Sequence, residues 1–173
     1  MTEDYARIEL QHIQIELVNK RYQHLRHFID QYFCYKKGYV NGNGNADWGQ
    51  IFWNEYVSSK AMEKTERSMV RKEHVIPLKR IRQELEKLAE TNKTSLEDIA
   101  ACLDKLVIFA TITREEDRKL TAAGLHDRMP PGYDQDGHRL YSNPFARYEI
   151  TGIQCKYAGN SSMQSSPAKA PRP

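Results

Sequence analysis

The 173-residue sequence has no long apolar run and few cysteines. No stretch reaches the roughly 18 consecutive apolar residues that a membrane-spanning helix needs, and the start of the chain lacks the basic and then apolar pattern of a secretory signal. The cysteines are odd in number and far apart, namely Cys34, Cys102 and Cys155, which argues against a disulfide framework and a four-thiolate zinc site. We therefore expect a cytoplasmic protein with reduced thiols and no membrane contact.

Several common catalytic motifs are also missing. There is no Gly-x-x-x-x-Gly-Lys-Ser/Thr phosphate loop, no third glycine after Gly42 and Gly44 to complete a dinucleotide fingerprint, and no Gly-x-Ser-x-Gly elbow. Asp134 and Asp136 resemble the start of an EF-hand loop, but its twelfth position is Phe145 instead of Glu. These absences exclude the usual nucleotide, hydrolase and EF-hand signatures.

The charge of the chain is small overall and unevenly spread. There are 26 Lys and Arg against 23 Asp and Glu, which gives a net charge of +3. Residues 60–93 hold 10 basic and 6 acidic side chains, whereas residues 1–157 as a whole sum to only +1. The sequence therefore points to one local basic stretch and to no general attraction for polyanions.

Residues 3–37 contain no Pro or Gly and carry apolar residues that recur every seven positions. One row is Ile8, Ile15, Tyr22 and Ile29, and a second row is Val18, Leu25 and Tyr32. This spacing predicts one long helix, or two helices broken near Asn19, with the seam buried against a partner. The pattern leaves open whether that partner is the rest of the bundle or another subunit in a homodimer.

Cap and turn residues divide the rest of the chain. Asp47 follows a Gly- and Asn-rich loop and is expected to cap a helix from Trp48 onward, with Met62 and Met69 on its apolar side. Residues 71–76 are expected to be extended because Pro77 follows them, and helices are expected at 77–90 and up to about residue 106. Thr113 begins a capping box, and Gly124 ends the helix that follows.

The predicted fold is mainly α, of the α+β kind, with a long N-terminal helix and a small β element near the C-terminus. That element is a buried strand over 107–112, paired with a strand within 147–157. Residues 1–157 form a single domain in this interpretation. Residues 158–173 are rich in Ser, Pro, Ala and Lys and are expected to be a disordered tail.

The sharpest local pattern is an acidic residue followed by His, two apolar residues and Pro, which is Glu73-His74-Val75-Ile76-Pro77. This order resembles the opening of an HNH-type (His-Me finger) nuclease site. The resemblance implies that His74 is a general base that activates water for attack on a phosphodiester, with Glu73 assisting and a divalent metal such as Mg²⁺ bound nearby. No Asn-Leu element with a following His or Asn stands downstream, and a structural role for His74 is the alternative.

Basic residues precede this histidine at helical spacing. They are Lys60, Lys64, Arg67 and Arg71, followed by Lys72. On one continuous helix the first four would form a basic stripe, which favours a nucleic-acid partner. Glu63 stands four residues before Arg67, so a solvated, self-paired surface is the alternative.

The segment 129–148 is a long loop that mixes aromatic and basic side chains. It is suited to stacking on bases or to contact with a protein, and its candidate residues are Tyr133, His138, Arg139, Tyr141 and Arg147. An ordinary packed surface loop is the alternative.

Two hypotheses of different classes follow. The first is a nucleic-acid-associated protein of a defence or mobile-element type that acts as a metal-dependent nuclease through His74. The second is a non-catalytic interaction factor, such as an inhibitor, immunity or adaptor protein. It would act through its N-terminal helix and the 129–148 loop.

Overall fold

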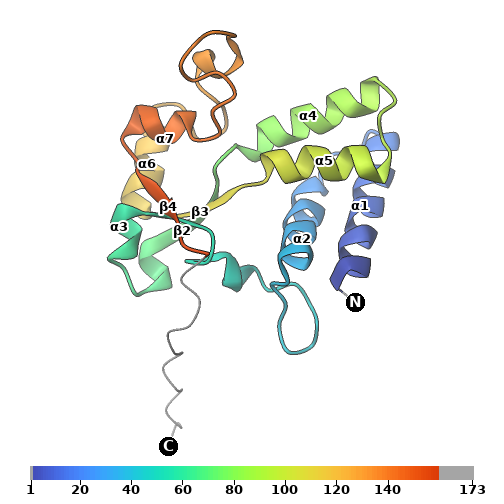
Figure 1. The fold of residues 1–173 in the computed structure, drawn as a ribbon, viewed down its shortest axis with the longest axis horizontal. Helices are drawn as coiled ribbons and strands as arrows, with labels where there is room; N and C mark the ends of the chain where they lie inside the picture. The colour runs from blue at the N-terminus through green and yellow to red at the C-terminus, as the bar shows by residue number, and fades with distance from the viewer. Residues whose placement is uncertain (1, 160–173) are drawn as a thin grey trace, which may run out of the picture.

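The computed structural model describes residues 2–159, which form helices and one small sheet around three apolar core clusters (Figure 1). The α-helices are α1 (Thr2–Val18), α2 (Leu25–Lys37), α3 (Ser59–Met62), α4 (Leu78–Glu90), α5 (Leu96–Leu106), α6 (Arg114–Ala122) and α7 (Ala146–Thr151). The strands are β1 (Tyr56–Ser58), β2 (Val70–His74), β3 (Phe109–Thr113) and β4 (Cys155–Tyr157). The chain is mainly helical, as predicted, and the expected tail lies largely outside the described residues.

The sheet has four strands in the order β2-β3-β1-β4, so the predicted two-stranded element is too small. β3 is the buried strand expected near 107–112, and all five of its residues are buried. It pairs with β2 in antiparallel and with β1 in parallel orientation, and not with the 147–157 segment. β4 reaches the sheet only through β1, where Tyr157 lies opposite Tyr56.

The predicted strand over 147–157 is wrong for its first part, which is helix α7. Gly152 ends this helix with a positive φ of 70°, and only then does the chain turn into β4. In α7 the adjacent residues Arg147 and Tyr148 are both buried, and Arg147 donates hydrogen bonds to Val75 and Leu125, which are distant in sequence. The apparent alternation of apolar residues does not determine the local structure.

The predicted single N-terminal helix is in fact two helices that pack side by side (Figure 1). The chain leaves α1 after Val18, and Lys20 adopts a positive φ of 53°. The break lies near Asn19, where the alternative interpretation placed it. α1 and α2 pack together with α4 and α5 around the largest core.

Local start signals are mostly confirmed. α4 follows Pro77, Ser95 caps α5 through the backbone N–H of Asp98, and Thr113 and Glu116 form the predicted capping box of α6. Asp47 caps only the short 3₁₀ helix η1 (Trp48–Ile51), so the longer helix expected through Met62 and Met69 is wrong. Over the described part of the chain, no helix combines the length and apolar character needed to cross a bilayer.

Candidate functional site

Strand β2 carries both residues of the Glu-His motif, but it points them in opposite directions. Adjacent side chains on a strand alternate between the two faces of a sheet. His74 packs on the α2 side, whereas Glu73 faces α7. The two side chains therefore do not meet at one site.

His74 belongs to a buried polar cluster with two further residues. Its Nε2 lies 3.0 Å from Oδ1 of Asp30 on α2, and Nζ of Lys72 lies 3.1 Å from the other oxygen, Oδ2. The His74 ring also lies 4.4 Å from that of Phe109, and Lys72 stands over the ring of Trp48. His74 is only 7% exposed, so the cluster joins α2 to the sheet and does not line an open cleft.

The cluster keeps Asp30 ionised. Burial of its side chain by itself raises the pKa, but the hydrogen bond and charge of His74, together with Lys72, outweigh burial and hold the pKa below the usual 3.8. Asp30 is then an anion between two basic groups. Sequence reasoning missed it because it lies 44 residues from His74 in the chain.

Glu73 is held by Arg147, whose side chain is fully buried. The guanidinium of Arg147 donates to Oε1 of Glu73 at 2.5 Å and to the carbonyl oxygens of Val75, at 2.8 Å, and Leu125, at 2.9 Å. It also donates to the carbonyl of His74. This arrangement ties α7 and the segment after α6 to β2, and it occupies the carboxylate that the nuclease hypothesis assigns to the reaction.

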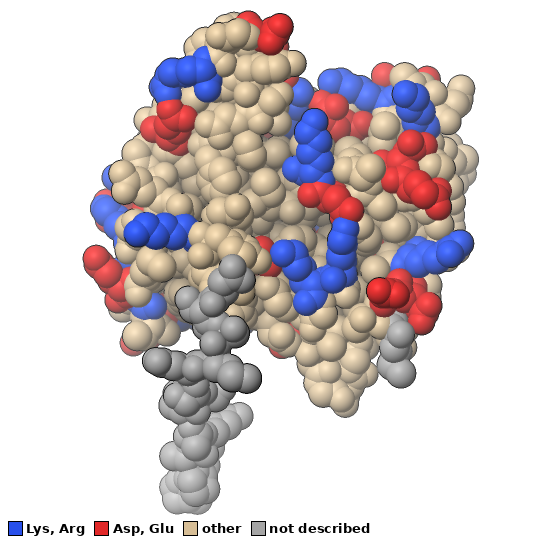
Figure 2. Space-filling view, in the orientation of Figure 1, with Lys and Arg blue, Asp and Glu red and all other residues tan. Residues whose placement is uncertain are grey.

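The five predicted basic residues do not form a stripe on one helix, because α3 ends at Met62 and β2 begins at Val70. Lys60 pairs with Glu115 at 3.2 Å, Arg71 pairs with Asp117 at 3.7 Å, and Lys72 pairs with Asp30. Arg67 stacks over the ring of Phe52, while Lys64 is half-buried. On the face shown in Figure 2, basic and acidic side chains are interspersed. Most of this charge is thus balanced by neighbours within the chain.

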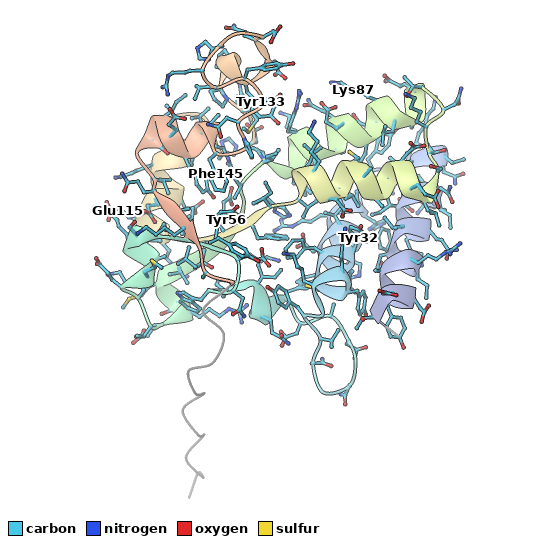
Figure 3. The ribbon with its side chains drawn as sticks, in the orientation of Figure 1. Tyr32, Tyr56, Lys87, Glu115, Tyr133 and Phe145 are labelled. Atoms are coloured by element: carbon cyan, nitrogen blue, oxygen red, sulfur yellow. The ribbon has the colours of Figure 1, made fainter. Side chains whose placement is uncertain are left out.

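The 129–148 loop is mainly a packed element. Tyr133 is buried and Arg147 is fully buried, while the ring of His138 lies directly against Gly132. Arg139 forms an ion pair with Glu149. Among the two tyrosines predicted as contact residues in this loop, Tyr141 is the accessible one, with 48% of its surface exposed. Figure 3 shows Tyr133 in this loop and Phe145 below it, near Tyr56, with which it makes a ring contact at 4.8 Å.

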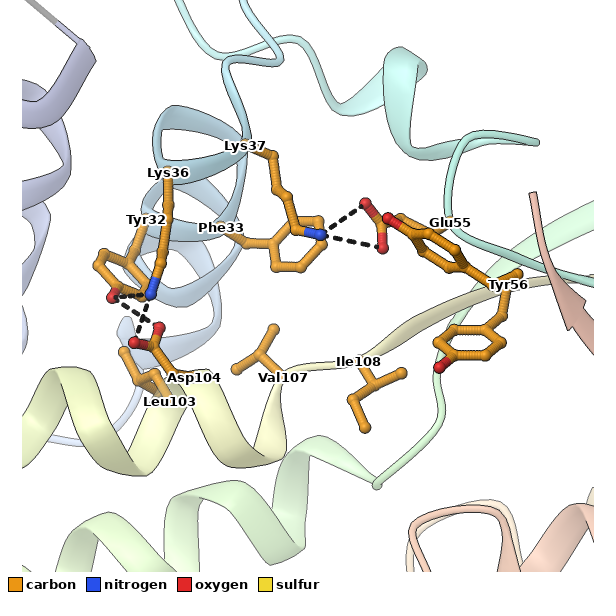
Figure 4. A pocket seen from close by; sticks show the side chains of 11 residues that line it. Tyr32, Phe33, Lys36, Lys37, Glu55, Tyr56, Leu103, Asp104, Val107 and Ile108 are labelled. Carbon is orange, nitrogen blue, oxygen red and sulfur yellow. Dashed lines mark hydrogen bonds and ion pairs between the residues drawn. The ribbon is translucent and has the colours of Figure 1, made fainter. Parts of the chain in front are cut away.

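A cavity of about 290 Å³ lies between α2, α5 and the edge of the sheet (Figure 4). Nζ of Lys37 lies 3.3 Å from Oε1 of Glu55, and the hydroxyl of Tyr32 donates to Oδ1 of Asp104 at 2.8 Å. Burial, and then the Asp104 carboxylate, raise the pKa of Tyr32 above its usual range. The charged groups around this cavity are therefore already paired with one another. Nothing in the sequence pattern pointed to it, because its lining comes from four distant segments.

Helix α1 exposes apolar side chains on the side away from the core. Ala6, Leu10, Ile13 and Leu17 are buried, whereas Ile8 is 41%, Ile15 54% and Val18 64% exposed. Of the seam predicted to be buried against the bundle or another subunit, the chain itself therefore leaves Ile8, Ile15 and Val18 uncovered, whereas it buries Leu25, Ile29 and Tyr32 on α2. We call the surface formed by Ile8, Ile15 and Val18 the outer face of α1.

Among residues 2–159, no three His, Cys, Asp or Glu side chains gather in a way that would hold a metal ion. Comparison with known proteins adds no family, because no family model, curated protein or solved structure matches the chain. No known protein therefore assigns a role to the residues of these candidate sites.

Proposed function

We propose that the protein is a non-catalytic interaction factor whose binding surface is the outer face of α1. The observation that carries this proposal is that three large aliphatic side chains of α1, Ile8, Ile15 and Val18, are exposed on the side that the chain does not cover. Exposed apolar side chains that gather in one place mark interaction surfaces.

The distribution of exposed apolar residues favours α1 over the other surfaces. Four of the ten large apolar side chains exposed within residues 2–159 lie on this one helix: Tyr5, Ile8, Ile15 and Val18. The others are spread over the chain, for example Met62, Tyr141 and Ile150. Scattered single residues of this kind are normal for protein surfaces and need no partner.

The surroundings of Glu73 and His74 also favour binding over catalysis. A general base needs access to the proton that it takes from water or substrate. His74 is in contact with Asp30 and Phe109, and Glu73 is in contact with Arg147. Each side chain thus already has a structural role in joining elements of the fold.

The proposal is tested by affinity enrichment from cells that make the protein, with the wild type, Ile15→Glu and Ile150→Glu as baits. Ile150 is a matched control because it is 48% exposed but lies on α7. We expect a partner that the wild type and the control retain and that Ile15→Glu loses. The captured partner, once purified, should show the same order of affinities in calorimetry.

Equal capture by all three baits would contradict the proposal. A nuclease assay provides a second test, in which the purified protein is mixed with DNA or RNA and Mg²⁺ or Mn²⁺. Cleavage of the nucleic acid would also contradict the proposal. Cleavage by the wild type that a folded His74→Asn variant lacks would favour the nuclease hypothesis instead.

A further inference from the structure

We propose that the cavity between α2, α5 and the edge of the sheet binds a small diamine, a molecule with an ammonium group at each end of an apolar body. The cavity is separate from the outer face of α1, whose residues do not line it, so this binding is independent of the proposed function. Two groups of side chains in the cavity hold ammonium ions, and the surface between them is apolar.

The first group surrounds the carboxylate of Glu55. The hydroxyl of Tyr39 donates to its Oε1 at 2.7 Å, and Nζ of Lys37 lies 3.3 Å from the same oxygen. The Lys37 ammonium also stands over the rings of Phe33 and Tyr157, at 5.5 and 5.9 Å from their centroids. A carboxylate beside aromatic faces attracts an ammonium group both by charge and by cation–π interaction.

The second group repeats this arrangement around Asp104. The hydroxyl of Tyr32 donates to Oδ1 of Asp104 at 2.8 Å, and Lys36 forms an ion pair with the same carboxylate. Nζ of Lys36 lies 5.7 Å from the centroid of the Tyr32 ring. Figure 4 shows the two groups at separate places in the one cavity. The cavity therefore has two positions for ammonium groups, which Lys36 and Lys37 occupy.

The lysines can leave these positions, whereas the carboxylate of Glu55 cannot. The side chain of Glu55 is only 5% exposed, but that of Lys37 is 39% and that of Lys36 is 48% exposed. Ion pairs that involve an exposed lysine contribute little to stability, so these side chains can rotate into water. A buried carboxylate left without a cation is unfavourable, and a ligand ammonium would replace the lost partner.

The two tyrosine hydroxyls keep the carboxylates in place without adding charge. Burial, and then the neighbouring Glu55 carboxylate, raise the pKa of Tyr39 above its usual range, as burial and Asp104 do for Tyr32. Both phenols therefore stay protonated at neutral pH and remain donors. Neither hydroxyl competes with an incoming ammonium group for the positive position.

The space between the two groups suits a short hydrocarbon chain. Leu103, Val107 and Ile108 contribute apolar side chains to the lining, and the first two are buried. The volume of about 290 Å³ is at the lower end for small-molecule sites, which limits the ligand to a few heavy atoms beyond its two ammonium groups.

The same geometry favours a dication over a dianion. A dicarboxylate could pair with Lys36 and Lys37 only beside the carboxylates that already face them, and Glu55 is buried and cannot move away. A diamine needs only that two exposed lysines rotate outward. Since the net charge of the chain is +3, the protein as a whole does not attract cations, and binding of a diamine has to come from a local site.

Isothermal titration calorimetry of the full chain tests the proposal, with straight-chain α,ω-diamines from diaminopropane to diaminooctane as probes. We expect binding whose affinity is highest at one chain length, because the two ammonium positions are fixed. Hexylamine and hexanediol, which lack one or both charges, should bind more weakly. No binding of any diamine, or equal binding of hexylamine, would overturn the proposal.

Variants of the two groups test the assignment of each side chain. Lys37→Met removes the built-in competitor, so we expect the diamine affinity to rise by about tenfold. Asp104→Asn should lower it by about tenfold, whereas Asp127→Asn, at a surface ion pair elsewhere, should leave it unchanged. Circular dichroism melts check that the variants are folded. Weaker binding by Lys37→Met, or unchanged binding by Asp104→Asn, would overturn the assignment.

The outcome is distinguishable from that of the interaction proposal. Ile15→Glu should bind the diamine like the wild type, because Ile15 does not line the cavity. Loss of diamine binding in this variant while it remains folded would overturn the cavity as the site. Failure of all diamines to bind leaves the partner capture through α1 unaffected.

Discussion

At the scale of single residues, Asp30 has a predictable effect on stability. Its folded pKa lies below the usual 3.8, so its ionised form stabilises the fold above the unfolded pKa, and this stabilisation is lost as the pH falls through the folded pKa. We expect the free energy of unfolding to decrease below about pH 4. Asp30→Asn should remove this part of the acid dependence and cost roughly 3–5 kcal/mol at neutral pH, because Lys72 and His74 lose their buried anion.

Urea unfolding at a series of pH values measures this effect. Asp127→Asn is the control, since Asp127 pairs with Lys79 and Arg128 at the surface, where such pairs contribute little. An Asp30→Asn variant with the stability and acid dependence of the wild type would show that the cluster does not join α2 to the sheet.

Arg147 gives a second residue-scale prediction. Arg147→Ala leaves the Glu73 carboxylate and several buried carbonyl oxygens without their donor, so we expect a loss of roughly 3–5 kcal/mol in the free energy of unfolding. Arg147→Lys should recover only a part, because an ammonium cannot reproduce the planar fork of donors. Thermal and urea unfolding check both variants. Arg139→Ala, whose ion pair with Glu149 is exposed, should lose less than about 1 kcal/mol.

At the scale of secondary-structure elements, the start of α6 combines a cap with a tertiary contact. Oε2 of Glu116 accepts hydrogen bonds from the Thr113 backbone at 2.8 Å and from the Ser58 hydroxyl at 2.6 Å. Thr113→Ala should therefore cost about 1–2 kcal/mol, at the upper end for N-cap residues. Ser95→Ala at the exposed start of α5 should cost less, and urea unfolding of the two variants compares them. A larger loss for Ser95→Ala would contradict the buried role of the α6 cap.

Some helices and strands were predictable from the sequence and others were not. The starts of α4, α5 and α6 were predictable because Pro77, Ser95 and Thr113 act on their own neighbouring backbone. The three-residue strand β1 and helix α7 were not, because pairing with β3 and burial of Arg147 decide them from far along the chain.

The apolar pattern of α1 shows a different limit. The helix carries two apolar rows, one through Leu10, Ile13 and Leu17 and another through Ile8, Ile15 and Val18. Periodicity predicts a helix from either row, but it cannot tell which row faces the core of the chain and which remains for a partner. The structure assigns the first row to the core. Likewise, the motif Glu73-His74 did not reveal that the partners of its side chains are Asp30 and Arg147.

At the scale of the whole molecule, the chain keeps its thiols protonated. Burial raises the pKa of Cys34 and Cys155 to about 12 and that of Cys102 to about 11. Because the thiolate is the reactive form, iodoacetamide should modify the native protein slowly at pH 8 and the urea-unfolded protein quickly. Peptide mass spectrometry measures each cysteine separately. Rapid modification of Cys34 in the native protein would contradict its burial in the core.

The central claim for the whole molecule is that the outer face of α1 is its binding surface. Methyl NMR spectra recorded while the captured partner is added test this most directly, because they report on individual side chains. Our account predicts that the methyl signals of Ile8, Ile15 and Val18 shift when the partner is added, while those of the buried Ile29 and Ile81 and of the exposed Ile150 do not. Unchanged signals for Ile8, Ile15 and Val18, or shifts centred on Ile150, would contradict it.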